Sequence, residues 1–174
     1  MGRKVCHGRA ALGGPVIQIH PNARVSPLAD LEDSVRGTRI EVGEGAVIDS
    51  FVKVKPAGGT GDLTIGSHSV INSGCVLYTG NGIRIGNNVA IAANCTFAPV
   101  NHAYKDKNTL IRLQGFLPGR GGIVLEDDVW VGANCVFLDG AVVRAGAVIG
   151  AGSVVRGEIP AYTVWAGTPL RQIV

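Results

Sequence analysis

The sequence contains few aromatic residues, few charged residues and no long apolar run. Aromatic side chains make up 5% of the 174 residues and charged side chains 17%, where about a quarter is usual. No apolar stretch approaches the ~20 residues of a membrane span, and the basic start lacks the apolar core of a signal peptide. Lysine and arginine are scattered, and the net charge is only +3. We therefore expect no membrane span and no nucleic-acid partner.

Glycine is abundant, whereas cysteine is limited to four residues. The 26 glycines amount to about 15% of the chain, where about 7% is usual, which indicates many turns. Four cysteines in a chain without a recognisable export signal predict reduced thiols and a cytoplasmic location. The length of 174 residues predicts a single domain.

A six-residue repeat runs through most of the chain. Its apolar positions are Ile19, Val25, Leu31, Val42, Ile48, Val54, Ile65, Ile71, Leu77, Ile85, Ile91, Phe97, Leu125, Val131, Phe137, Val143, Ile149 and Val155. The residue two places before each of these is never charged. Because a strand alternates its faces, both positions point inward, while Arg39, Arg84 and Trp130 point outward. Three such strands make one coil, so the sequence predicts an all-β triangular column of about six coils.

The spacing also locates insertions, which follow Leu31, Val54, Leu77 and Phe97 and therefore leave the same edge of the column. The longest lies within residues 98–122 and is the prime functional candidate. Glycines that follow the inward residues are expected to provide positive φ at the corners. We expect an N-terminal tail at 1–15, the β-helix at 16–160 with inserted loop 98–122, and a C-terminal extension at 161–174.

Several motifs give the chain a family resemblance. These are Asn101-His102 at the start of the long loop, GIVLEDDVWVGANCVFLDG (122–140), VIGAGSVV (148–155) and AGTPLRQI (166–173). Together with the repeat they resemble the hexapeptide-repeat acyltransferases, left-handed parallel β-helix enzymes that use acyl-coenzyme A. The segments INSGCVLYTGNGIRIG (71–86) and IRLQGFLPGRGGIVLEDDVW (111–130) are most similar to polysaccharide and lipopolysaccharide O-acetyltransferases. The maltose and galactoside acetyltransferases are similar from Ile85 onward.

His102 is the candidate catalytic residue. An unperturbed imidazole, with a pKa of about 6.5, suits a general base near neutrality. The resemblance implies that His102 takes the proton of an acceptor hydroxyl as its oxygen attacks the thioester. A backbone carbonyl or Asp106 could orient the other ring nitrogen, and a solvated loop histidine is the alternative interpretation. His20, His68 and His7 lack metal spacing, so we expect no metal, unlike the γ-class carbonic anhydrases, which share this fold.

The resemblance also implies a coenzyme groove. Trp130, Gly132 and Ala133 would lie beside the pantetheine arm of acetyl-CoA, and Ala151 would face the same arm. The phosphates of coenzyme A require cations, for which Arg156 and Arg171 are the candidates. The alternative for Trp130 is packing at a subunit contact.

Uncharged polar residues are candidates for binding a sugar acceptor. They are Asn72, which stands at a matching family position, and Asn81, Asn101 and Gln114. Asparagines at corners also cap turns or stack as ladders, which is the alternative interpretation. The run PGRGG (118–122) could hinge the loop or bind phosphate.

Three cysteines share one inward position on successive coils, namely Cys75, Cys95 and Cys135. We expect a column of buried thiols rather than a metal or redox site, because a dry core offers no entry path. An acyl-cysteine intermediate is therefore disfavoured.

These observations predict an O-acetyltransferase that moves an acetyl group from acetyl-CoA to a sugar hydroxyl. The resemblance further implies a homotrimer with active sites between neighbouring columns. The alternatives are an amino-sugar N-acetyltransferase, a non-catalytic structural β-helix and, third, a zinc hydratase.

Overall fold

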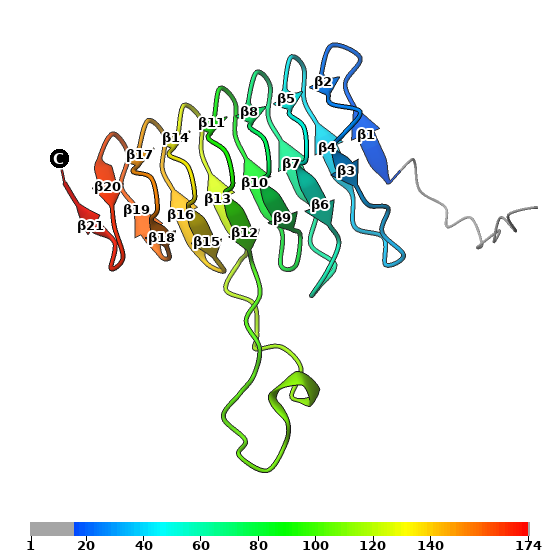
Figure 1. The fold of residues 1–174 in the computed structure, drawn as a ribbon, viewed down its shortest axis with the longest axis vertical. Helices are drawn as coiled ribbons and strands as arrows, with labels where there is room; N and C mark the ends of the chain where they lie inside the picture. The colour runs from blue at the N-terminus through cyan, green and yellow to red at the C-terminus, as the bar shows by residue number, and fades with distance from the viewer. Residues whose placement is uncertain (1–15, 174) are drawn as a thin grey trace, which may run out of the picture.

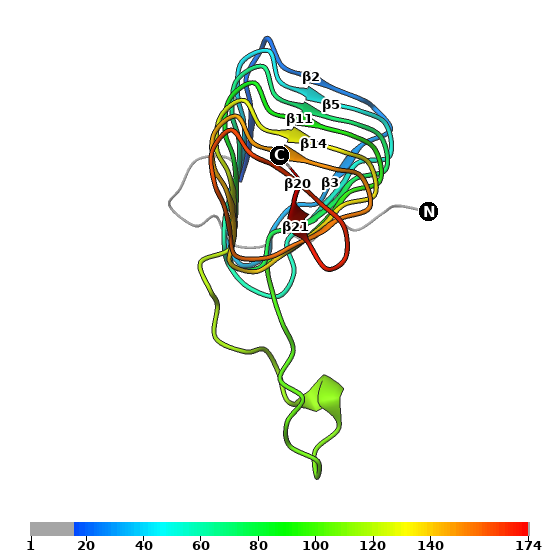
Figure 2. The same ribbon diagram turned by 90° about the vertical axis from the view of Figure 1, so that its left-hand side faces the viewer.

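A computed structural model describes residues 16–173, which wind into a left-handed parallel β-helix with three walls (Figures 1 and 2). Strands β1 to β18 form six complete coils, each giving one strand to each wall. The predicted fold class and number of coils are confirmed. The expected segment 1–15, with Cys6 and His7, lies outside the described residues.

The strands of each wall pair in parallel and in sequence order, except β21, which pairs antiparallel with β20 at the end of the second wall. The first wall contains β1 (Ile17–Ile19), β4 (Ile40–Val42), β7 (Leu63–Ile65), β10 (Ile83–Ile85), β13 (Ile123–Leu125), β16 (Ala141–Val143) and β19 (Glu158–Ile159). The second contains β2 (Arg24–Val25), β5 (Val47–Ile48), β8 (Val70–Ile71), β11 (Ala90–Ile91), β14 (Trp130–Val131), β17 (Val148–Ile149), β20 (Val164–Ala166) and β21 (Arg171–Gln172). The third contains β3 (Asp30–Leu31), β6 (Lys53–Lys55), β9 (Val76–Tyr78), β12 (Thr96–Ala98), β15 (Val136–Leu138) and β18 (Val154–Val155).

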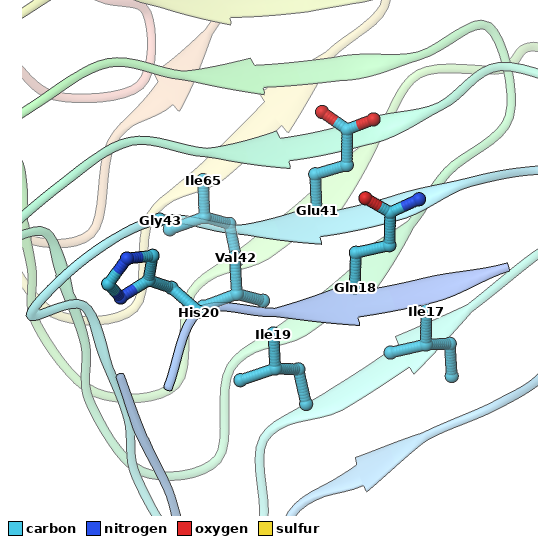
Figure 3. A pocket seen from close by; sticks show the side chains of 8 residues that line it. All are labelled: Ile17, Gln18, Ile19, His20, Glu41, Val42, Gly43 and Ile65. Atoms are coloured by element: carbon cyan, nitrogen blue, oxygen red, sulfur yellow. The ribbon is translucent and has the colours of Figure 1, made fainter. Parts of the chain in front are cut away.

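The core is the stack of inward side chains that the repeat predicts. Every predicted apolar position from Val42 to Val155 is buried. Phe97 and Phe137 stack with ring centroids 4.7 Å apart, so the register continues across the long insertion. Within residues 16–173 the first coil has a neighbouring coil on one side only, and its inward Ile19 is 44% exposed. Figure 3 shows Ile17 and Ile19 on one face of β1 and Gln18 on the other.

The corner glycines do not have the conformation that the sequence suggested. Gly43, Gly66, Gly86, Gly132 and Gly150 are absent from the left-handed region, so the predicted positive φ was wrong at these positions. They are needed because coils stack closely: a Cβ on Gly66 would lie 2.3 Å from the carbonyl oxygen of Gly86. Positive φ occurs two residues later instead, for example at His68 (59°) and Asn134 (59°).

All four predicted insertions leave the column where the third wall passes to the first. They comprise residues 32–39, 56–62, 79–82 and 99–122. We call this corner the loop edge. The long loop 99–122 projects from it, between β12 and β13, and carries the single-turn 3-10 helix η1 (Ile111–Leu113) (Figures 1 and 2).

The C-terminal end is closed by a hairpin. β20 continues the second wall in parallel with β17, and β21 returns antiparallel to β20. Trp165 and Leu170 pack against the core at this end. No helix among residues 16–173 has the length and apolar character needed to cross a membrane.

Candidate functional site

His102 lies near the start of the long loop, where the two limbs form a short antiparallel ribbon. The N–H of Ala103 donates to the carbonyl of Gly115 (3.0 Å), and the N–H of Leu117 donates to Asn101 (2.7 Å). The His102 ring contacts the ring of Phe116, with centroids 4.5 Å apart. The side chain is exposed, and within residues 16–173 neither ring nitrogen is hydrogen-bonded. The imidazole is thus held by an aromatic contact with its nitrogens open.

The far end of the loop is stabilised by its own polar groups. The Gln114 amide donates to the carbonyls of Asp106 (2.8 Å) and Thr109 (2.7 Å) and accepts from the N–H of Asp106 (3.2 Å). The hydroxyl of Thr109 and the N–H of Asn108 hold the pKa of Asp106 below its usual range. The Asp106 carboxylate therefore binds local loop groups, and the structure does not pair it with His102.

The loop joins the column beside a buried carboxylate. Asp139, 4% exposed, follows β15 at the loop edge. It accepts from the side chain of Asn81 (3.1 Å) and from the N–H groups of Arg120 (2.8 Å) and Gly122 (3.0 Å). Sequence reasoning did not find Asp139, because Asp-Gly after a strand has the signature of an ordinary turn. Its side-chain partner, Asn81, lies 58 residues away in the sequence.

The residues predicted beside the pantetheine arm lie at or next to a different corner, where the second wall passes to the third. Small residues occupy this corner in three successive coils, and we call it the small-residue edge: Ala92, Ala93, Gly132, Ala133, Gly150 and Ala151. A Cβ on Gly132 would lie 2.5 Å from the amide nitrogen of Ala151, so Gly132 and Ala151 are adjacent. Trp130 is 57% exposed on the neighbouring second wall, beside Ala90.

Asn72 lies at the same corner, toward the N-terminal end of the small-residue edge. Its side chain donates to the carbonyl of Ile91 (2.7 Å) in the next coil, and its carboxamide oxygen has no protein donor within residues 16–173. Asp49 and Ser73 form a neighbouring pair at 2.6 Å, and the Ser73 hydroxyl lowers the pKa of Asp49. Asn72 thus contributes both a ladder hydrogen bond and an available acceptor.

The two candidate arginines lie near the C-terminal end of the column. Arg156 follows β18 at the loop edge and lines a groove of about 460 Å³ with Trp165 and Pro169. Arg171 is exposed in β21, opposite Ala166 on the second wall. The two guanidinium groups therefore belong to different faces.

The predicted site is divided between two edges of the third wall. His102, Asn101, Asn81, Gln114 and Arg156 belong to the loop edge. Trp130, Gly132, Ala133, Ala151 and Asn72 belong to the small-residue edge or the wall beside it. One chain thus presents an exposed imidazole at one edge and a row of small residues at the other.

The three core cysteines form the expected column. Cys75, Cys95 and Cys135 are free thiols with no exposed surface, and each donates to a carbonyl in the following coil. The neighbouring thiol of Cys95, followed by burial, raises the pKa of Cys135. Cys95 lowers the pKa of Cys75, yet that sulfur is equally inaccessible. None of the three is available to an acyl donor.

No metal-binding set is present in the part of the chain that the structure describes. Among residues 16–173, no three side chains of the His, Cys, Asp or Glu type are grouped to hold an ion. His20 accepts from the N–H of Asn22 (3.2 Å), and His68 is a left-handed corner residue. Neither is grouped with His102.

Known proteins with the same repeat include several acyltransferases. Residues 122–157 match the family described as "Bacterial transferase hexapeptide (six repeats)". A hexapeptide-repeat-containing acetyltransferase of Vibrio cholerae, solved with acetyl-coenzyme A, has a TM-score of 0.67 and 30% identity, over 77% of this chain and 69% of that chain. AntD, an N-acyltransferase of Bacillus cereus solved with dTDP and 3-hydroxybutyryl-CoA, has a TM-score of 0.72 and 22% identity, over 88% and 79%. This second likeness concerns the fold alone.

Sequence relatives match shorter stretches. The 2,3,4,5-tetrahydropyridine-2,6-dicarboxylate N-acetyltransferase of Staphylococcus aureus is 46% identical over 56 residues, which are 32% of this chain and 23% of that protein. The chain spans 23% to 52% of the length of the first curated relatives that it matches.

Proposed function

Because the chain belongs to the hexapeptide-repeat transferase family, we propose that it is an acyl-CoA-dependent acetyltransferase whose acceptor is a carbohydrate hydroxyl. One observation carries the proposal: the long loop, which projects from the loop edge of the column, presents the exposed His102 with both ring nitrogens open. The acceptor class that we favour is a building block of lipopolysaccharide, O-antigen or exopolysaccharide, as the similarity of residues 71–86 and 111–130 suggests.

The proposed reaction is a direct transfer within a ternary complex. His102 removes the proton of the acceptor hydroxyl as the oxygen attacks the thioester carbonyl carbon. The resulting tetrahedral intermediate collapses with cleavage of the carbon–sulfur bond. The sulfur of coenzyme A leaves with the proton that the imidazolium returns. The inaccessibility of Cys75, Cys95 and Cys135 favours this route over an acyl-cysteine intermediate.

The small-residue edge is the proposed site of the coenzyme. Gly132, Ala133 and Ala151 leave room for a pantetheine arm along the column, and the exposed Trp130 offers an apolar surface beside it. Arg171, and Arg156 from the loop edge of a neighbouring column, would bind phosphates of the nucleotide end, since both guanidinium groups are exposed. The Vibrio cholerae relative is described as complexed with acetyl-coenzyme A, which supports this cofactor.

Asn72 and Asn101 are the proposed acceptor contacts. Asn72 has an available carboxamide oxygen, and Asn101 is adjacent to His102. Asn81 and Gln114 have amides engaged inside the loop or its base, so we propose that they support acceptor binding by holding the loop.

The division of the site between two edges supports a homotrimer, in which the loop edge of one column meets the small-residue edge of the next. The loop carries exposed apolar side chains that such a contact would cover, including Tyr104 (61%) and Leu113 (61%). Free buried thiols fit a reducing compartment, and we propose a cytoplasmic location.

The first experiment measures release of free thiol from acetyl-CoA with a panel of sugars, nucleotide sugars and oligosaccharides. We expect at least one hydroxyl acceptor to raise the rate, and His102→Ala to lower turnover by about 10²–10⁴-fold. Asp128→Asn, an exposed substitution away from the loop, is the control.

Calorimetry with coenzyme A distinguishes a transferase from a non-catalytic structural β-helix. Absence of coenzyme A binding at millimolar concentration would contradict any acyl-CoA-dependent transferase.

Transfer to an amine is the second candidate. Its support is that the Staphylococcus aureus relative is described as an N-acetyltransferase. An amine that arrives unprotonated needs no strong base, so amino sugars should then be the preferred acceptors and His102→Ala should retain most turnover. The same panel therefore separates the two reactions.

A further inference from the structure

The buried carboxylate at the loop edge connects three separate segments of the chain. Asp139 lies in the turn between β15 and β16, Asn81 in the turn between β9 and β10, and Arg120 to Gly122 at the end of the long loop. All three groups that contact the carboxylate are N–H donors, at 2.8 to 3.1 Å. The contact with Gly122 is fully buried. A carboxylate suits this position because it presents only acceptors.

Both limbs of the loop converge on this pair. Asn81 donates from its backbone N–H to the carbonyl of Pro99 on the outgoing limb (3.3 Å) and from its side chain to Asp139. On the returning limb, a Cβ on Gly119 would lie 2.7 Å from the Asn81 carboxamide, so that side chain fills the space against the limb. The N–H of Gly140 also donates to the carbonyl of Gly122 (2.7 Å). The loop therefore leaves and re-enters the column beside one pair of side chains, Asn81 and Asp139, which we call the clamp.

The clamp is linked to the imidazole through the ribbon. The returning limb continues from Arg120 back to Phe116, whose ring contacts His102. The hydrogen bonds between Leu117 and Asn101 and between Ala103 and Gly115 join this limb to the outgoing one. Apart from the contact with Phe116, the His102 side chain makes no hydrogen bond, ion pair or ring contact within residues 16–173. Displacement of the returning limb thus moves the surface on which the imidazole rests.

We propose that Asp139 is a positioning residue that sets the place of His102 through the loop, with Asn81 as its partner. The consequence for turnover rests on the proposed function, whereas the consequence for the place of the imidazole does not. Asp139 touches no reacting group in this scheme. It fixes the N–H groups of Arg120 and Gly122, and thereby the returning limb.

The chain offers a matched control on another edge. Asn87 and Asp127 form a similar Asn–Asp pair between the fourth and fifth coils, with the Asp127 carboxylate accepting from the N–H (2.8 Å) and the side chain (3.2 Å) of Asn87. This pair lies where the first wall passes to the second, away from the loop. Asp127→Asn therefore repeats the chemical change without disturbing the clamp.

The first measurement is amide hydrogen exchange of the full chain. In Asp139→Asn the NH₂ group must face either Gly122, at the Oδ1 position, or both Arg120 and Asn81, at the Oδ2 position, so the N–H of Gly122 or that of Arg120 loses its acceptor. We expect at least one of these two amides to exchange about tenfold faster, with Asn81→Ala giving a smaller effect in the same place. In Asp127→Asn they should keep the wild-type rates. Unchanged exchange at Arg120 and Gly122 in Asp139→Asn overturns the clamp.

The second measurement follows His102 itself. In protein labelled at the histidine Cε1 carbon, the His102 signal is identified by its loss in His102→Gln. The chemical shift of this signal includes the ring current of Phe116. We therefore expect Asp139→Asn, but not Asp127→Asn, to move the His102 chemical shift toward its value in Phe116→Leu.

The third measurement is an acetyl-transfer assay, in which Asp139→Asn should lower kcat about tenfold and keep the acetyl-CoA KM within about twofold. A His102 signal and a kcat equal to those of Asp127→Asn would leave Asp139 a merely structural residue and overturn the proposal.

The proposed function and the positioning role of Asp139 can be contradicted independently of each other. If wild-type protein neither binds coenzyme A nor releases thiol, the proposed function is wrong, and the His102 signal still decides whether Asp139 positions the ring. If transfer is present and the amides and the His102 signal respond but kcat does not, the proposal that this positioning serves catalysis is overturned. If Asp139→Asn fails to fold, Asn81→Ala is measured instead, with smaller expected changes in amide exchange, in the His102 chemical shift and in kcat.

Discussion

Buried serine and cysteine side chains play the same structural role in the column: each donates a hydrogen bond to a backbone carbonyl. Ser69 and Ser153 occupy inward positions equivalent to those of Cys75, Cys95 and Cys135, and each hydroxyl donates to a backbone carbonyl at the corner of a neighbouring or its own coil. The cysteines make the same kind of contact with longer bonds from sulfur. The thiols are therefore small packing groups that satisfy one carbonyl each, and their alignment follows from the register of the third wall.

The buried thiols should be unreactive in the folded protein. In a Cys6→Ser background, Cys75, Cys95 and Cys135 remain, and we expect no reaction with an aromatic disulfide reagent until denaturant unfolds the chain. Under full denaturation three thiols should be counted. Rapid labelling of the native protein, prevented by coenzyme A, would contradict the assignment of these residues to the core and reopen an acyl-cysteine route.

Asp139 and His102 show why single residues differ in how well a sequence predicts them. His102 could be selected because it lies at the start of the longest insertion and matches a motif. Its contact with Phe116 could not, because it depends on how residues 101–103 pair with 115–117. Asp139 carries no local signal, since its three partners lie 17, 19 and 58 residues away along the chain.

At the scale of the strands, ion pairs on the first wall bind successive coils. Arg144, after β16, donates to Glu126 after β13 (2.7 Å) and to Glu158 in β19 (2.8 Å). The Arg144 hydrogen bond and the N–H of Ala145 hold the pKa of Glu126 below its usual value of 4.5. Because the folded carboxyl binds a proton less readily than the unfolded one, this contribution to stability is present above about pH 4.5 and is lost as the pH falls below it.

Glu126→Gln should therefore reduce the acid sensitivity of the fold. Wild-type Tm is expected to fall between pH 5 and pH 3, and the variant should lose about 1–3 °C less over this range, because a partly exposed ion pair contributes little. Calorimetric scans of both proteins measure the difference, with the exposed Asp128→Asn as control. An identical slope for Glu126→Gln and wild type would show that this pair has no part in acid unfolding.

The strands and the core could be predicted because their signal is local. An inward residue at every sixth position specifies the walls, and interruptions of that spacing locate the insertions at one edge. The role of the corner glycines could not be deduced in this way. Gly66 and Gly132 are required by the approach of the next coil, which the sequence of one corner does not contain. The exposure of Ile19 likewise reflects its place at the end of the stack.

At the scale of the whole molecule, the separation of the two edges has a direct consequence for assembly. His102 belongs to the loop edge, whereas Gly132 and Ala151 belong to the small-residue edge across the third wall. In the proposed homotrimer each active site combines one edge from each of two neighbours. A subunit that lacks His102 can then still supply the coenzyme lane to the next subunit.

Mixed trimers test this composite site. His102→Ala removes the base, and Ala151→Tyr fills the coenzyme lane at an exposed position that the fold should tolerate. Each variant alone should be nearly inactive. When the two chains are refolded together in equal amounts, about one quarter of the sites should pair an intact loop edge with an intact small-residue edge, since each is present with probability of about one half in a threefold ring. Recovery of about a quarter of wild-type turnover, with trimeric mass by sedimentation, supports the shared site. Activity no greater than the mean of the two parents contradicts it and assigns both functions to one chain.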